Sequence, residues 1–207
     1  MPHDLELIGR QSSHYTRVSR IFAHELGVDV RFTPIVDLMS VDAAVFAGNP
    51  TLRLPILRID GETVFGTSNI CRVLARSAGR EADVFWPEDA DTPLLLNAHE
   101  VLASAMAVQV EVVMHERVAQ RPADSVSIKR KQGLVNSVRW LEDHLDAVQA
   151  SLTGKPLRSF DIGLFCLVEH FPFRNPVDVS GMPRLAAFAA AFGQRASAQA
   201  TPYLFDA

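Results

Sequence analysis

The sequence predicts an α/β domain with a small mixed sheet, followed by an all-helical domain. Three observations support this fold class. Short apolar runs of strand length alternate with a helical pattern over residues 1–79, a charged stretch containing Pro87 follows, and the remaining sequence has long helical periodicity with few breakers. We expect boundaries of 1–79 for the first domain, 80–92 for a linker and 93–207 for the second domain.

The first three elements predict a strand-helix-strand unit. Leu5–Ile8 is a short apolar run typical of a strand, and Val28–Phe32 is a second one. Between them, Thr16 is placed to cap a helix that ends at Gly27. Two strands joined by a helix should be parallel, with a right-handed crossover. The apolar stripe of the helix comprises Val18, Ile21, Phe22 and Leu26.

The rest of the first domain predicts a hairpin and a second helix. Asp60-Gly61 is a strong two-residue hairpin signal, so the strands on either side should be antiparallel. Thr67 or Ser68 is placed to cap the helix that follows. In chain order, the expected elements are a short helix near 41–46, strands at 55–59 and 62–65, and a helix carrying Ile70, Val73 and Leu74.

The second half predicts a set of four helices. The first, 94–118, has two apolar faces, so we expect it to contact two neighbours. The segment Asp161–His170 is apolar around its whole axis and should be a buried central helix, capped by Ser159 and stopped at Phe171-Pro172. The other expected elements are a helix at 126–150 with a stripe of Ile128, Leu134, Val138, Leu141 and Leu145, a helix at 185–192, and a surface tail from Ala198.

Composition narrows the function classes. The net charge is −4, and the longest basic run is Lys129-Arg130-Lys131, so nucleic acid and anionic membrane are poor candidate partners. No apolar run approaches the length of a membrane-spanning helix, and the first residues do not resemble a secretory signal. Cys71 and Cys166 lie far apart and form no metal-binding cluster. These observations predict a cytoplasmic protein without a metal or a structural disulfide.

Three segments resemble motifs of the glutathione transferase superfamily. They are Ser12-Ser13-His14-Tyr15-Thr16-Arg17, Asn49-Pro50-Thr51-Leu52-Arg53-Leu54-Pro55-Ile56-Leu57 and Gly66-Thr67-Ser68-Asn69-Ile70-Cys71-Arg72-Val73-Leu74. In the helical half, 135–145, Asp161-Ile162, Phe173-Arg174 and 197–202 look similar to bacterial serine-type members. The resemblance implies a thioredoxin-like domain followed by a helical domain. It also implies glutathione as co-substrate, a homodimer, and a role in detoxification.

By this resemblance, the hydroxyl of Ser13 stabilises the glutathione thiolate. A free thiol has a pKa of about 8.5, and lowering that pKa by two requires about 2.7 kcal/mol. A hydrogen bond to a charged acceptor contributes about 1.5–3 kcal/mol, so one hydroxyl aided by a helix N-terminus is sufficient. Ser12 and Tyr15 are competing candidates for this role. The alternative interpretation is that these hydroxyls only cap the helix.

The resemblance also implies how the tripeptide is held. Leu54-Pro55 would be a cis peptide bond that lets the Leu54 backbone pair with the cysteinyl backbone, whereas a trans proline opening an edge strand is the alternative. Thr67, with Ser68 and the free N–H groups of its helix, would bind the γ-glutamyl carboxylate, unless it is a plain N-cap. Arg53 could pair the glycyl carboxylate or be a solvated charge. The full predicted glutathione-binding set is Ser12, Tyr15, Arg53, Leu54, Pro55, Gly66, Thr67 and Ser68.

Departures from the family pattern define the competing functions. Gly66 stands where the family has an acidic residue, and Leu52 and His14 replace a glycine and a proline. We expect a transferase that conjugates glutathione to hydrophobic electrophiles, or alternatively a binding protein of the same fold with little catalysis. A disulfide reductase is disfavoured because segment 12–16 has no cysteine. The expected second-substrate pocket comprises Met106, Val110 and Phe165, although such a stripe is also typical of a core.

Overall fold

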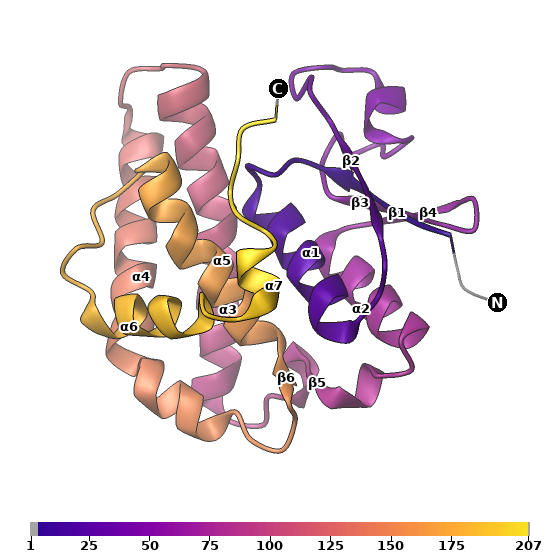
Figure 1. Cartoon of the computed structure of the whole chain (residues 1–207). Helices are drawn as coiled ribbons and strands as arrows, with labels where there is room; N and C mark the ends of the chain where they lie inside the picture. The colour runs from indigo at the N-terminus through magenta and orange to yellow at the C-terminus, as the bar shows by residue number, and fades with distance from the viewer. Residues whose placement is uncertain (1–3, 207) are drawn as a thin grey trace. The chain divides into compact units, whose positions relative to one another are not determined.

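The computed structural model describes residues 4–206 (Figure 1). The chain forms two compact units. The first unit holds the chain up to Val84 together with the stretch from Gln194 onward, and the second unit is Phe85–Gly193. The stretch from Gln194 therefore packs with the N-terminal part of the chain, which the division of the sequence at 80–92 does not anticipate.

The first unit is built on a four-stranded sheet with the order β2-β1-β3-β4. The strands are β1 (Leu5–Gly9), β2 (Arg31–Pro34), β3 (Ile56–Ile59) and β4 (Glu62–Phe65). As the sequence predicts, β1 and β2 are parallel and β3 and β4 are antiparallel. The hairpin turn at Asp60-Gly61 is also confirmed, because both residues have positive φ, at 50° and 90°.

The second strand begins later than its predicted start at Val28. Gly27 adopts the left-handed conformation that ends helix α1 (His14–Leu26), and the Val28 N–H donates to the Ala23 carbonyl at 2.9 Å. Val28 therefore satisfies a carbonyl at the end of the helix instead of pairing in the sheet, and β2 starts at Arg31. The predicted apolar stripe of α1 is confirmed, because all four of its residues are buried.

The caps predicted for the first two α-helices are wrong. Helix α1 begins at His14 with Ser13 as its N-cap, and the Thr16 hydroxyl accepts the Arg10 N–H instead, at 3.3 Å. Helix α2 (Thr67–Ser77) has Gly66 as its N-cap, with φ 86° and ψ 133°, and no side-chain cap. The backbone of Gly66 takes a conformation that glycine adopts readily, so Gly66 is the N-cap and Thr67 is the first residue of the helix.

Apolar residues on the two faces of the sheet pack against different segments. Helices α1 and α2 pack against each other on one side (Figure 1). On the other side, Ile8 and Ile56 are paired in register and pack with Ile35 and Phe46. Phe46 belongs to the short helix η1 (Ala43–Phe46), which Asp42 caps by accepting the Ala44 N–H at 2.9 Å. Packing on both faces of the sheet holds in place the end of β1, the start of β3 and the end of β4, where the candidate site lies.

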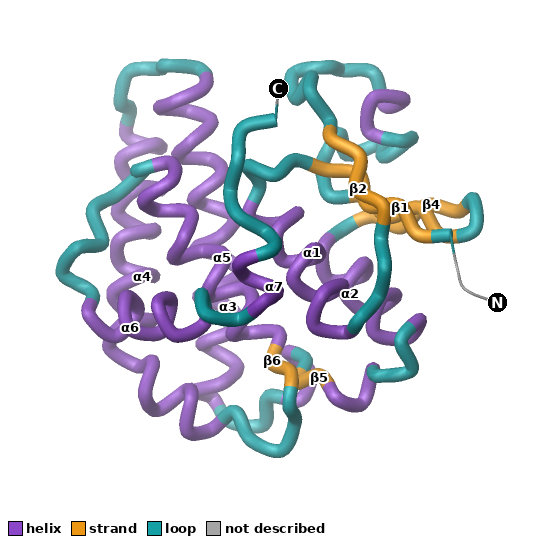
Figure 2. Tube along the Cα trace, in the orientation of Figure 1, coloured by secondary structure: helices purple, strands orange, loops and turns teal. Residues whose placement is uncertain are grey.

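The second unit is mainly helical (Figure 2). The elements of the second unit are the last residue of β5 (Val84–Phe85), η3 (Pro87–Asp89), α3 (Pro93–Val113), the π-helical turn η4 (Met114–Val118), α4 (Ser125–Ser151), β6 (Leu157–Arg158), α5 (Ser159–Arg174) and α6 (Pro183–Phe192). Helix α3 packs against α4 and α5, and α6 also packs against α4 and α5. Two short helices, η2 (Glu81–Asp83) and α7 (Ala196–Gln199), belong to the first unit.

Two sequence predictions for the central helix are wrong. Helix α5 continues through Pro172 to Arg174, and its C-cap Asn175 has a positive φ of 49°. A proline this close to a helix end removes only one hydrogen bond, so the last residues can still follow the helical path. Ser159 does not cap α5, because its hydroxyl donates to the Phe85 carbonyl at 2.7 Å. The prediction that α5 is buried is confirmed, since Ile162, Leu164 and Leu167 are fully buried.

Two predictions of burial also need correction. Ile128, expected on the buried stripe of α4, is 60% exposed. The nearby Val126 is also exposed, at 54%. Periodicity identifies the stripe but not how far along the helix a neighbour covers it. The tail from Ala198, expected on the surface, includes the buried residues Ala198 and Thr201, because α7 packs against α1. None of the helices in the described part of the chain combines the length and apolarity that crossing a membrane requires.

Candidate functional site

Three segments of the first unit meet at one end of its sheet. The N-terminus of α1 follows β1, the Leu54-Pro55 bond precedes β3, and Gly66 follows β4. Because β3 is antiparallel to both neighbours, the end of β1, the start of β3 and the end of β4 lie side by side. The register places Ile8 opposite Ile56 and Ile56 opposite Phe65. The sheet therefore brings together three motifs that are separate in the sequence.

The loop after β1 is held tightly against the first turn of α1. Gly9 approaches Thr16 so closely that an added Cβ would lie 2.5 Å from the Thr16 hydroxyl oxygen. The Arg10 N–H donates to that oxygen at 3.3 Å, and the Ser13 N–H donates to the Arg10 carbonyl at 3.1 Å. Only glycine fits at position 9 without displacing Thr16. These contacts fix the backbone that carries Ser13.

Ser13 is a half-buried N-cap whose proton remains available. Its oxygen accepts the Thr16 N–H at 3.3 Å, so one lone pair serves the helix. No acceptor for the Ser13 hydroxyl proton is found among residues 4–206, so the group can donate to an anion near the α1 N-terminus. Ser12 differs because it is buried, with 4% of its surface exposed.

Tyr15 lies close enough to Arg53 for the two to interact electrostatically. Burial raises the pKa of the Tyr15 phenol, and the Arg53 guanidinium partly opposes that rise. The phenol therefore stays protonated at neutral pH and can donate a hydrogen bond. The neighbouring His14 is 1% exposed, and its ring centroid lies 4.5 Å from that of Tyr15. The interaction connects the first motif to the second motif across the end of the sheet.

The Leu54-Pro55 peptide bond is cis, as the resemblance implies. The loop before it is braced by Asn49, which is 2% exposed. The Asn49 amide donates to the Arg53 carbonyl at 2.7 Å and accepts the Thr51 N–H at 3.0 Å. Leu52 has a positive φ of 54°, a conformation that glycine adopts more readily. Pro55 is buried, Leu54 is half-buried and Arg53 is exposed, so the side chain of Arg53 can reach solvent.

The N-terminus of α2 presents backbone donors without a side-chain cap. Gly66 has no side chain to accept the N–H groups of Thr67 and Ser68. Helix α6 shows within the same chain how a carboxylate satisfies such donors, because Glu142 accepts the Arg184 and Leu185 N–H groups at 2.9 and 2.8 Å. The α2 N-terminus has the same chemistry and suits a carboxylate ligand.

The three residues predicted to line a second-substrate pocket lie in the second unit. Met106 and Phe165 are buried, and the Phe165 ring stacks on Phe192 with centroids 4.6 Å apart. Val110 is 38% exposed, whereas the adjacent Gln109 is fully buried. Their role in substrate binding stays a prediction. Both cysteines are buried and neither forms a disulfide within the described residues, among which no cluster of potential metal ligands occurs.

Comparison with known proteins places these features in context. Residues 12–77 match the family described as Glutathione S-transferase, N-terminal domain, and this range contains all three motifs. No curated protein matches the sequence. The chain has the glutathione transferase fold: a thioredoxin-like mixed sheet with helices, followed by a helical region.

The fold assignment rests on similarity to solved structures of low sequence identity. A glutathione S-transferase from Methylobacillus flagellatus KT, with glutathione bound, is 22% identical with a TM-score of 0.78, and the match covers 97% of this chain and 100% of that one. One from Methylobacterium radiotolerans JCM 2831, in complex with glutathione sulfonate, is 19% identical with a TM-score of 0.76, covering 98% and 97%. A glutathione transferase family member from Pseudomonas fluorescens Pf-5, with bound glutathione, is 21% identical with a TM-score of 0.73, covering 97% and 99%.

Proposed function

We propose that this protein binds glutathione and transfers it to hydrophobic electrophiles. The observation that carries this proposal is the meeting of three donor-bearing segments at one end of the sheet. A serine hydroxyl, the backbone beside a cis proline and an uncapped helix N-terminus match a ligand with a thiol, a peptide backbone and a carboxylate. The similar structures with bound glutathione or glutathione sulfonate support this choice of ligand.

Each part of the tripeptide has a proposed partner. The Leu54 backbone pairs with the cysteinyl backbone, as a strand pairs with its neighbour. The N–H groups of Thr67 and Ser68 bind the γ-glutamyl carboxylate, in the way that the α6 N-terminus binds Glu142. Arg53 pairs the glycyl carboxylate, and the nearby Tyr15 phenol adds a donor. Ser12, Pro55 and Gly66 shape the backbone around these groups.

Ser13 acts on the sulfur in this proposal. Its hydroxyl donates to the thiolate while its oxygen continues to accept the Thr16 N–H. The partial positive charge at the α1 N-terminus stabilises the same anion. The thiolate forms a bond from sulfur to the electrophilic carbon of the second substrate, and the leaving group departs with its electron pair. The protein contributes positioning and electrostatic stabilisation rather than a covalent intermediate.

The test of this role is the ionisation of the bound thiol in a Ser13→Ala variant. Loss of one hydrogen bond to the thiolate should raise the pKa of the bound thiol by about one to two. Ultraviolet absorbance of the thiolate, followed against pH with saturating glutathione, measures it. Ser12→Ala tests the competing serine, and because the Ser12 side chain is buried, the pKa of the bound thiol in this variant should stay at the wild-type value. An unchanged pKa in Ser13→Ala would rule out the catalytic assignment, and a rise confined to Tyr15→Phe would transfer the role to Tyr15.

A binding protein with little catalysis is the second candidate function. The specific observation in its favour is Gly66, whose positive φ and missing side chain leave no acidic group at the N-terminus of α2. A ligand amine would then lack a charged partner there. Calorimetry with glutathione, combined with turnover assays on several electrophile classes, separates the two functions. Binding without turnover of any electrophile would favour the second candidate.

The remaining features of the proposal concern the second substrate, assembly and location. Met106, Val110 and Phe165 stay the proposed contacts for the hydrophobic electrophile. A homodimer follows from the resemblance, and Leu96 is an exposed apolar residue on α3 that a second copy could cover. Detoxification in the cytoplasm is the proposed setting, with no metal required.

A further inference from the structure

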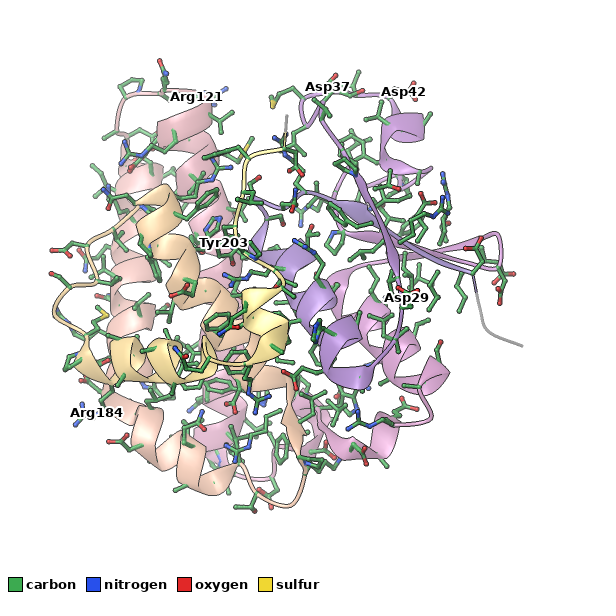
Figure 3. All side chains as sticks on the ribbon, viewed as in Figure 1. Asp29, Asp37, Asp42, Arg121, Arg184 and Tyr203 are labelled. Atoms are coloured by element: carbon green, nitrogen blue, oxygen red, sulfur yellow. The ribbon has the colours of Figure 1, made fainter. Side chains whose placement is uncertain are left out.

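The segment Arg195–Asp206, here called the strap, runs along α1 within the first unit (Figure 1). Its contacts progress from the C-terminal end of α1 toward the N-terminal end, so the strap is antiparallel to the helix. Along the strap, Arg195 and Ser197 bond to Glu25, the Ala198 and Ala200 carbonyls accept from the Arg17 and Arg20 guanidinium groups at 3.4 and 3.5 Å, and the Tyr203 ring lies 4.3 Å from the Arg17 guanidinium (Tyr203 is labelled in Figure 3). The strap therefore reaches the loop that precedes Ser13.

The last described residue of the strap, Asp206, has a buried carboxylate that binds this loop. One carboxylate oxygen accepts the Gln11 backbone N–H at 3.0 Å, and the other accepts the Gln11 side-chain amide at 3.3 Å. The Arg10 guanidinium forms an ion pair with Asp206 at 3.5 Å. The Asp206 side chain is 3% exposed and that of Arg10 is 15% exposed, so water competes little for these bonds.

These bonds hold the two residues just before Ser12 and Ser13. The Arg10 N–H is already fixed by Thr16, and the Ser13 N–H closes a turn back to the Arg10 carbonyl. The Gln11 N–H, between these anchors, finds its acceptor 195 residues away in Asp206. The second arm of the Arg10 guanidinium donates to the Val36 carbonyl at 2.9 Å, which ties the same loop to the segment after β2. Asp206 thus completes the set of anchors on the loop.

We propose that Asp206 is a positioning residue for the thiol site, acting through Gln11 and Arg10 on the Ser13 hydroxyl. This inference rests on the proposed function, because Ser13 is the group that would meet the thiolate. A carboxylate suits the role because it accepts a backbone N–H, a side-chain amide and a guanidinium together. Its charge is balanced by Arg10, so it does not oppose a thiolate nearby.

The first measurement is hydrogen exchange of the Gln11 amide in ligand-free protein. Asp206→Ala should accelerate this exchange about tenfold, the loss expected when one charge-assisted hydrogen bond is removed. Asp206→Asn keeps an acceptor and should give an intermediate rate. Asp29→Ala is the matched control, because Asp29 is an exposed aspartate of the same unit (Figure 3). The Gln11 amide of this variant should exchange at the wild-type rate. Unchanged exchange in Asp206→Ala overturns the inference.

The second measurement is the pKa of bound glutathione thiol, with the dissociation constant from calorimetry. Asp206→Ala should raise that pKa and weaken binding by about three- to tenfold, with Asp206→Asn restoring part of both. If Asp206 had a purely structural role, Asp206→Ala would lower the unfolding temperature and leave the pKa of the bound thiol unchanged. That result overturns the inference about Asp206 but not the proposed function. Wild-type protein that binds no glutathione overturns the proposed function, and the thiol role of Asp206 falls with it. Gln11 exchange still shows in that case whether the strap contact exists.

Discussion

At the residue scale, Glu6 shows how the sheet register sets the charge state of a buried group. Glu6 is 8% exposed, and the β1 register places it opposite Arg31 on one side and Arg58 on the other. The Thr33 hydroxyl donates to its carboxylate at 2.6 Å, and Arg58 donates at 3.0 Å. The hydrogen bond from Thr33, followed by the arginines, lowers the pKa of Glu6 below its ordinary value of 4.5, against the opposing effect of burial.

A lowered pKa makes the contribution of Glu6 to stability depend on pH. The contribution is fully present above the unfolded pKa of 4.5 and is lost as pH falls through the lower folded pKa. We therefore expect the stability of the wild type to fall more steeply below pH 4.5 than that of Glu6→Gln. Urea unfolding at a series of pH values measures the difference. Parallel curves for the two proteins would contradict this account.

At the scale of elements, helix N-termini are satisfied in different ways. Ser13, Thr92 and Asp124 cap α1, α3 and α4 with their side chains, whereas α6 takes its acceptor from Glu142 on another helix. Helix α2 has no side-chain cap and lies at the candidate site. Helices α5 and α7 also lack a side-chain cap, so it is the position of the α2 N-terminus at the end of the sheet that leads us to assign this helix to ligand binding.

The role of Glu142 gives a prediction about stability. Glu142→Ala leaves the Arg184 and Leu185 N–H groups without their acceptor, so it should lower the free energy of unfolding by about 1–3 kcal/mol. Chemical denaturation measures this change. The control is Asp143→Ala at the adjacent, exposed position, which should change stability by less than about 0.5 kcal/mol. Equal effects at both positions would show that the buried carboxylate does not support α6.

At the scale of the whole molecule, the C-terminal stretch from Gln194 packs in the same unit as the N-terminal part of the chain. The strap brings Asp206 to Gln11, so the first unit contains both early and late parts of the sequence. Substitutions near residue 206 are therefore expected to act on the loop after β1, far away in the sequence. The proposed assembly is the other property at this scale, because it concerns surfaces rather than single contacts.

We expect light scattering to give twice the mass of one chain, with no monomer at micromolar concentration. The physical reason is that exposed apolar side chains on α3, such as Leu96 at 53% exposure, would be covered by a second copy. Leu96→Glu should weaken the association without unfolding the chain, as circular dichroism would confirm. A stable monomer in the wild type would remove the homodimer from the proposal.

Much of the fold follows from local sequence. The Asp60-Gly61 turn was predictable because both positions need positive φ, and the strands around it follow from short apolar runs. The candidate site residues could be predicted because their segments resemble family motifs; they include Ser13, Leu54-Pro55 and Thr67. The caps were harder to predict, since several hydroxyls precede each helix and the choice depends on which oxygen reaches a free N–H.

The sequence by itself determined the succession of the strands along the chain, the directions of the β1–β2 and β3–β4 pairs, the helical second half and the segments of the candidate site, because these depend on patterns within a few residues. Only the tertiary structure decided that α5 passes through Pro172, that Thr201 is buried and that Asp206 binds Gln11. The reason is that burial and hydrogen bonding across 195 residues depend on how the elements pack, and no local pattern records that packing.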